Sequence, residues 1–149
     1  MGLFNILKGE KQNLKDATDE WTVFAQKMCV TAVEYAKEFN KKLDYSETGI
    51  ADLEEILDLY SKDIAISKPT ENQIWSIAII FGSYLGEALL RNGLSQKGFA
   101  WGREASSNVP LLIKDGGSYL APNDKVYKRL VNGSEDSVVS FYRFAVKEV

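Results

Sequence analysis

The sequence feature that most constrains the fold is the apolar segment between Thr70 and Asn92. On a helical wheel, apolar side chains cover most of its circumference, and polar side chains are confined to one narrow stripe that only Ile80 interrupts. A helix that is apolar nearly all round is buried by other elements. The segment therefore predicts a central helix around which the rest of the chain is arranged. The polar stripe consists of Gln73, Ser76, Ser83, Glu87 and Arg91.

Both ends of this helix are marked by residues that start or stop helices. Pro69 disfavours helix at the residue before it, and Thr70 with Gln73 forms a capping-box pattern. Asn92 or Gly93 is free to adopt the left-handed turn that ends many helices. We therefore expect a helix that begins after Thr70 and ends near Asn92.

Two glycines four residues apart, Gly82 and Gly86, have two interpretations. A membrane dimer motif needs a span of about 20 mainly apolar residues, whereas the run here is bounded by Gln73 and Glu87 and contains serines. We therefore expect no membrane span. We expect instead that the glycines let the first helix approach closely. That helix carries a stripe of small residues, namely Ala25, Cys29, Ala32 and Ala36.

Periodic apolar patterns predict the other helices. Residues 13–40 and 50–64 carry apolar side chains at helical spacings. Toward the C-terminus, a helix with Asn123 as its cap ends at Gly133, and Ser134 caps the last helix.

Between these helices the period changes to that of strands. Residues 99–104 alternate in polarity, an apolar run follows Pro110, and a short strand through Tyr119 lies beyond an Asp-Gly-Gly turn. Pro110 is compatible with a strand end. The pattern predicts a three-stranded antiparallel meander.

The length of 149 residues suits one domain. We predict a single α+β domain over residues 1–149, with residues 1–12 as a loosely ordered N-terminal segment. Its long N-terminal helix is followed by second and third helices that pack on the three-stranded antiparallel meander, and two helices close the chain.

Composition excludes several kinds of chemistry. The chain has no histidine and one cysteine, Cys29, which removes histidine-based catalysis and cysteine-based zinc sites. We expect no metal ion and no cofactor, and we assign no catalytic residue. One cysteine suits the cytoplasm, and a net charge of −3 argues against a nucleic-acid partner.

The second predicted helix is acidic. Residues 46–70 contain six acids and two lysines. One interpretation is an ordinary solvated helix face. The other is a docking surface for a basic protein partner, formed by Asp52, Glu54, Glu55 and Asp58.

Glu87 also has two interpretations. It pairs with Arg91 one turn later, which contributes about 0.2–0.5 kcal/mol at the surface. Alternatively, it is a partly buried acid that faces Arg103 or Tyr84 at the rim of the sheet. The second interpretation makes Tyr84, Glu87, Arg91 and Arg103 a candidate functional polar cluster.

Four short motifs, in this order, carry a resemblance to a known family. They are LDYSETGIADLEEIL, GSYLGEALLR, FAWGRE and APNDKVYKRLVNGSEDSVVSFY. Residues 43–142 resemble a family of small uncharacterised bacterial α+β domains, in which a Tyr-Leu-Gly-Glu helix end precedes a tryptophan strand. The resemblance implies an α+β layout with Tyr84, Gly86, Glu87 and Trp101 as signature positions, and it implies no particular activity.

Two classes of function follow from these patterns. The first is a cytoplasmic protein-interaction domain, of which an immunity-like protein that binds a basic toxin is one concrete form. The alternative is a small-molecule binding domain or an enzyme that uses Glu87, with Arg103, Tyr84 or Lys97, in a cleft between the third helix and the sheet. Self-association as a homo-oligomer through aromatic side chains is a third alternative.

Overall fold

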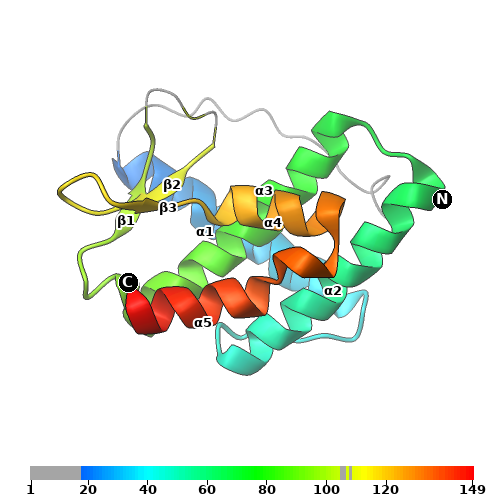
Figure 1. The fold of residues 1–149 in the computed structure, drawn as a ribbon, viewed down its shortest axis with the longest axis horizontal. Coiled ribbons are helices and arrows are strands. Elements are labelled where there is room, and N and C mark those ends of the chain that lie inside the picture. The colour runs from blue at the N-terminus through cyan, green and yellow to red at the C-terminus, as the bar shows by residue number, and fades with distance from the viewer. Residues whose placement is uncertain (1–17, 105–106, 108) are drawn as a thin grey trace.

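The computed structural model describes residues 18–149 apart from 105, 106 and 108 (Figure 1). The predicted start of the first helix near residue 13 and the predicted loose segment 1–12 lie outside the described residues. Within them, the predicted α+β class is confirmed. The helices are α1 (Thr18–Lys37), α2 (Glu47–Ser67), α3 (Glu71–Leu89), α4 (Pro122–Asn132) and α5 (Val138–Glu148), with a π-helical turn η2 (Leu90–Leu94) and a 3₁₀ turn η3 (Ser134–Asp136). The strands are β1 (Ala100–Gly102), β2 (Leu111–Ile113) and β3 (Tyr119–Leu120).

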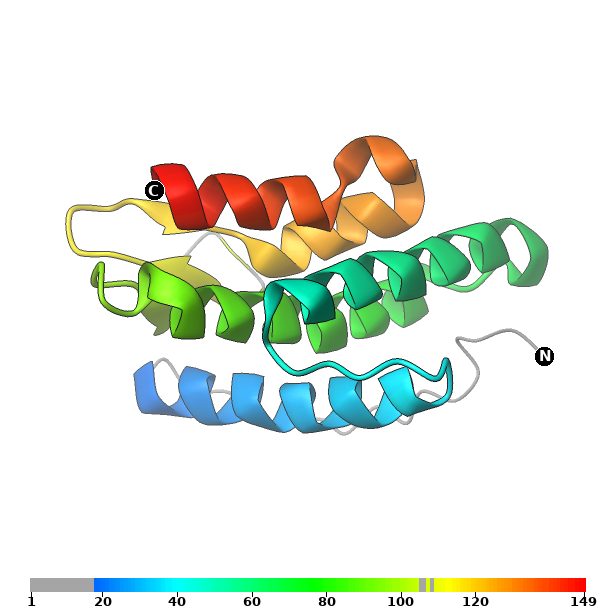
Figure 2. The same ribbon diagram turned by 90° about the horizontal axis from the view of Figure 1, so that it is seen from below.

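Helix α3 is the central element, as its apolar circumference predicts. Figure 2 shows α1 on one side of α3, and α4 and α5 on the other side. Every residue from Ile80 to Leu89 is buried. The elements that surround α3 therefore bury its second half completely.

By length and composition, α3 and η2 together (Glu71–Leu94, mean hydropathy 1.3) could cross a membrane. The argument that the run is too short therefore does not hold, because the helix continues beyond Glu87 into the π-helical turn. Within the protein, 72% of its apolar window is buried. Most of this helix is therefore covered by other parts of the described chain.

The predicted start and end of α3 are confirmed. The Thr70 hydroxyl accepts a hydrogen bond from the Gln73 amide at 3.2 Å, and the Gln73 side chain accepts one from the Thr70 amide at 2.8 Å. At the other end, Gly93 takes the positive φ of 136°, whereas Asn92 does not. Among the two candidate stop residues, the chain therefore turns at the glycine.

The predicted caps of the last two helices are wrong. Asn123 does not cap α4, because its side chain is fully buried and lies against Gly82 of α3. Ser134 lies in η3, and Ser137 caps α5 by accepting a hydrogen bond from the Ser140 amide at 3.2 Å. After Ser134 the chain forms the 3₁₀ turn η3 instead of α5, because Asp136 accepts hydrogen bonds from Lys125 and Asn132 of α4.

The meander has the predicted antiparallel order, with β2 in the centre. Trp101 lies opposite Leu112, and Leu112 lies opposite Leu120. Pro110 immediately precedes β2 and so leaves its ladder intact. The sheet packs at one end of the molecule on α1 and α4, whereas α2 packs on α4 and α5 (Figure 1). The prediction that α2 packs on the sheet is therefore wrong.

Gly82 and Gly86 face α4 and the sheet, and the prediction that they face α1 is wrong. A Cβ atom on Gly82 would lie 2.6 Å from Cα of Asn123, and one on Gly86 would lie 2.3 Å from Cη2 of Trp101. The two glycines therefore let α4 and Trp101 approach the α3 backbone. The small residues of α1, namely Ala25, Cys29, Ala32 and Ala36, are buried.

Candidate functional site

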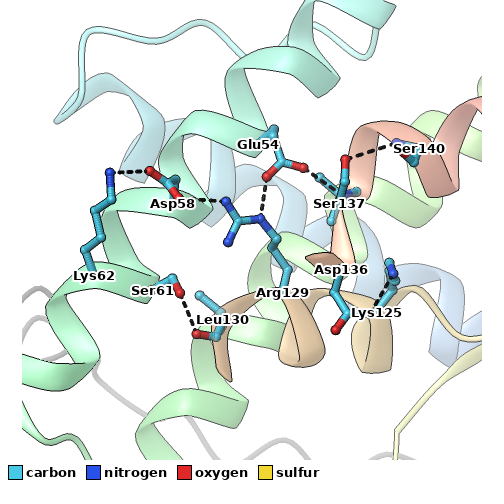
Figure 3. A network of polar contacts seen from close by, with 11 residues as sticks. Glu54, Asp58, Ser61, Lys62, Lys125, Arg129, Leu130, Asp136, Ser137 and Ser140 are labelled. Atoms are coloured by element: carbon cyan, nitrogen blue, oxygen red, sulfur yellow. Dashed lines mark hydrogen bonds and ion pairs between the residues drawn. The ribbon is translucent and has the colours of Figure 1, made fainter. Parts of the chain in front are cut away.

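The acidic face of α2 is organised around a buried arginine from α4. The side chain of Arg129 is only 2% exposed. Its Nε donates to a carboxylate oxygen of Glu54, and its Nη2 donates to Asp58 at 2.9 Å (Figure 3). Because a guanidinium cannot lose its proton at neutral pH, burial requires such carboxylate partners.

Glu54 also connects this arginine to α5. Its second carboxylate oxygen accepts a hydrogen bond from the Val138 amide at 2.8 Å. This amide belongs to the first turn of α5, where a helix has no backbone acceptor of its own. One carboxylate therefore joins α2, α4 and α5. Glu54 thus has a structural role, whereas the sequence predicted it only as part of a partner surface.

The outer carboxylates of α2 pair with lysines at the surface. Lys62 lies 2.8 Å from the second oxygen of Asp58. Lys41 binds Glu55 and lies 3.8 Å from Asp52. Hydrogen bonds from Lys62, and then from Arg129, hold the pKa of Asp58 below its ordinary value. Asp58 is thus charged at neutral pH, and the lysines and Arg129 partly neutralise the acidic face.

A groove of about 620 Å³ lies on this face. Three of the four acids of the predicted partner surface line it. The fourth, Asp52, does not line it but lies 3.8 Å from Lys41, which does. Leu59 is the apolar residue of the lining and is 46% exposed. We call this cavity the α2 groove. Its lining residues are Lys41, Glu54, Glu55, Asp58, Leu59, Arg129, Ser134 and Ser137.

Sequence reasoning missed Arg129, although a signal for it exists. Val126 and Leu130 mark the buried face of α4, and Arg129, three residues after Val126, lies next to Val126 on the side away from Leu130. A cation on the buried side of one helix needs the acids of another. The acidic run on α2 is the complementary signal.

The predicted polar cluster is brought together only in part, around Tyr45. The centroid of the Tyr84 ring lies 4.8 Å from that of the Tyr45 ring. The Arg91 guanidinium lies over the Tyr45 ring, 3.6 Å from its centroid. Glu87 is 6% exposed, and the expected Glu87–Arg91 pair is absent from the ion pairs of the described residues. Arg103 instead donates to the Ser107 carbonyl at 3.1 Å.

Tyr45 is held in an uncommon backbone conformation. Its φ is +68°, in the left-handed region that non-glycine residues rarely occupy. The Tyr84 hydroxyl accepts from its amide at 2.8 Å, and the Asn92 side chain donates to its carbonyl at 2.6 Å. These contacts fasten the α1–α2 connection to the end of α3.

Cys29 interacts with Tyr45, and both side chains have raised pKa values. Burial, and then the charge of Glu87, raises the pKa of the Cys29 thiol to about 12. Burial also raises the pKa of the Tyr45 hydroxyl to about 12. Both groups stay protonated near neutral pH, so neither is an activated nucleophile.

The polar stripe of α3 lies in two different environments. Gln73 and Ser76 are partly exposed and bind backbone within the first turns, whereas Ser83 and Glu87 are buried. Among the described residues, no three His, Cys, Asp or Glu side chains are grouped so that they could hold a metal ion.

Comparison of the chain with protein-family models, curated proteins and solved structures finds no match. The resemblance of residues 43–142 to small bacterial α+β domains stays a prediction.

Proposed function

We propose that this chain is a cytoplasmic protein-interaction domain that binds a basic protein partner at the α2 groove. Immunity-like binding of a basic toxin is one form of this function. The observation that supports it most is the combination of a groove, solvent-reachable carboxylates and an exposed apolar residue on one face of α2.

The carboxylates of this face are available to a partner. The side chain of Glu55 is 62% exposed and that of Asp58 is 37% exposed. Their lysine partners, Lys41 and Lys62, form surface ion pairs, which are typically worth about 0–1 kcal/mol. A cation from a partner can therefore replace either lysine at little cost.

Charge and shape both favour a basic partner. The groove lining carries three carboxylates and two cations. Leu59 provides apolar contact beside them, because it is half-exposed on the same helix. Interfaces combine such a buried apolar contact with charges that guide association.

The alternative function at Glu87 has less support. Glu87 is buried, and the α2 groove does not include it. Its neighbours Cys29 and Tyr45 have raised pKa values, which removes the usual partner groups for acid–base or nucleophilic chemistry.

Capture of partners from the native host tests the proposal. We would compare the unchanged chain with Glu55→Lys and with Glu34→Lys as a matched control. Glu34 is also 62% exposed and also pairs with a lysine, Lys37, but it lies on α1. We expect Glu55→Lys to abolish capture and Glu34→Lys to leave it intact, and added salt should weaken capture. Equal capture by both variants, or no partner at all, would contradict the proposal.

A further inference from the structure

Two helical segments end in the same dipeptide, asparagine followed by glycine. Asn92 and Gly93 lie in η2 at the end of α3, and Asn132 is the last residue of α4 with Gly133 behind it. Both asparagines are exposed. Both glycines have a positive φ, 136° for Gly93 and 89° for Gly133. This dipeptide is prone to deamidation, because glycine has no side chain to shield its main-chain nitrogen from the asparagine before it.

Deamidation requires a particular movement of the asparagine. The main-chain nitrogen of the glycine loses its proton and bonds to Cγ of the asparagine, the bond from Cγ to Nδ2 breaks, and Nδ2 takes up a proton and leaves as ammonia. Water then opens the resulting succinimide at either carbonyl, which gives aspartate or isoaspartate. The asparagine side chain and the glycine amide must therefore both leave their hydrogen bonds before they meet.

The side chain of Asn92 is held by a distant part of the chain. Its Nδ2 donates to the Ala88 carbonyl at 2.8 Å and to the Tyr45 carbonyl at 2.6 Å. Tyr45 precedes Asn92 by 47 residues. Release of Asn92 therefore requires the α1–α2 connection to separate from the end of α3.

The bonds that hold Asn132 and Gly133 lie at one end of the same helix. Nδ2 of Asn132 donates to a carboxylate oxygen of Asp136 at 2.8 Å, and the Gly133 amide donates to the Arg129 carbonyl at 3.1 Å. Helix ends fray, because local opening needs least free energy where few contacts cross to the rest of the fold. Fraying of the last turn of α4 therefore frees both reacting groups while the rest of the fold stays in place.

We propose that Asn132 is a site of spontaneous deamidation, and that the reaction weakens the connection between α4 and α5. The product places a carboxylate where a donor to Asp136 stood, and two neighbouring carboxylates repel each other. The new charge also lies at the C-terminal end of α4, where the helix dipole disfavours a negative group. Of the two α4 side chains that bind Asp136, Lys125 then remains (Figure 3).

This inference goes beyond the proposed function and does not depend on it. Asp136 lies in η3, which leads into Ser137, the cap of α5. Ser134 and Ser137 also line the α2 groove. Deamidation of Asn132 therefore loosens one wall of the groove with time, and water is the co-reactant.

Incubation of the full folded chain in mildly alkaline buffer tests the proposal. Peptide mapping by mass spectrometry follows the two asparagines separately, and an isoaspartate methyltransferase labels the isoaspartate product. We expect Asn132 to react several-fold faster than Asn92 in the folded chain, and both to react at similar rates in guanidinium chloride. Equal rates in the folded chain, a faster Asn92, or no reaction at Asn132 while the unfolded chain reacts would overturn the proposal.

The variant Asp136→Ala tests whether the bond to Asp136 restrains the reaction. It removes the acceptor of Nδ2, so it should speed the reaction at Asn132 several-fold and leave that at Asn92 unchanged. Glu135→Ala, at the neighbouring exposed residue, is the matched control and should change neither rate. Equal acceleration at both asparagines, or acceleration at neither, would contradict this role of Asp136.

The variant Asn132→Asp tests the structural consequence. The hydrogen bond from Asn132, and then that from Lys125, holds the pKa of Asp136 below its ordinary value. Asn132→Asp should therefore raise the pKa of Asp136, and Asn132→Ala should raise it less, because alanine removes the bond without adding a charge. Nuclear magnetic resonance follows this carboxylate and the Val138 amide, whose signal should shift as the start of α5 loosens. Unchanged signals in Asn132→Asp would show that deamidation leaves the connection intact and would overturn that part of the proposal.

Discussion

Arg129 and Glu54 lie 75 residues apart in the sequence, and their side chains form a hydrogen-bonded ion pair between α4 and α2. The same carboxylate accepts the Val138 amide of α5. One charged group thus joins three helices that pack on one another. The wall of the α2 groove is part of this connection, so the groove is held by the core rather than by a loop.

Glu54→Ala should destabilise the protein strongly. The change leaves a buried guanidinium with Asp58 alone and leaves the Val138 amide without its acceptor. Loss of one partner of a buried pair typically costs about 3–5 kcal/mol, and we expect about 3 kcal/mol because Glu54 is partly exposed. Urea unfolding followed by circular dichroism measures the difference. Glu55→Ala, one residue later, is the control and should cost about 1 kcal/mol or less; equal losses would refute the structural role of Glu54.

The ion pairs of Asp58 should make stability depend on acid pH. Its pKa in the folded protein is lowered from the ordinary value of 3.8, first by Lys62 and then by Arg129. A lowered folded-state pKa gives stability that is complete above the unfolded-state pKa and is lost as the pH falls through the folded-state pKa. We expect the unchanged chain to be more stable than Asp58→Asn at neutral pH and to lose this advantage below about pH 4. Urea unfolding at a series of pH values checks this, and a difference that does not vary with pH would speak against it.

Gly82→Ala should destabilise the protein although alanine favours helices. Alanine gains about 1 kcal/mol over glycine in a helix interior. Here its Cβ would meet the Asn123 backbone at 2.6 Å, so α4 has to move away from α3. Overpacking of this kind typically costs about 1–3 kcal/mol. We expect a net loss in urea unfolding, with Ser76→Ala at the partly exposed end of α3 as a near-neutral control. A gain in stability for Gly82→Ala would show that the close approach is not needed.

The sequence predicted features that depend on neighbours in the chain. The Thr70–Gln73 capping box and the antiparallel meander are set by residues close in sequence, and both are confirmed. The central position of α3 also follows from its own residues, because an apolar circumference needs burial on every side.

Features that depend on distant partners were predicted less well. Glycine spacing shows that a close approach occurs, but whether Gly86 meets α1 or Trp101 depends on how α3 is rotated in the core. The two serines Ser134 and Ser137 are equally good caps in sequence, and the binding of Asp136 to α4 decides between them. Likewise, the acids of α2 were visible, whereas the buried cation that organises them comes from 71 to 75 residues away.

The reaction rate of the Cys29 thiol shows whether the residues around Tyr45 activate a nucleophile. Burial, followed by the charge of Glu87, raises the pKa of its thiol from 9.0 to about 12. Thiol reagents attack the thiolate, so the folded protein should react far more slowly near pH 8 than the protein unfolded in urea.

The variant Glu87→Gln separates the two causes of this pKa shift. Because burial is the larger cause, removing the charge of Glu87 should lower the thiol pKa only in part and leave the folded protein slow to react. A thiol-specific chromophoric reagent measures both rates, with reaction in urea as the reference for a free thiol. An activated nucleophile would give the opposite order, with the folded protein reacting faster than the unfolded one. That result would make Cys29, Tyr45 and Glu87 a candidate catalytic cluster. A low-pKa thiolate beside a carboxylate requires a compensating cation. Arg91 fits that role, because it lies over the Tyr45 ring and its charge lowers the pKa of the thiol.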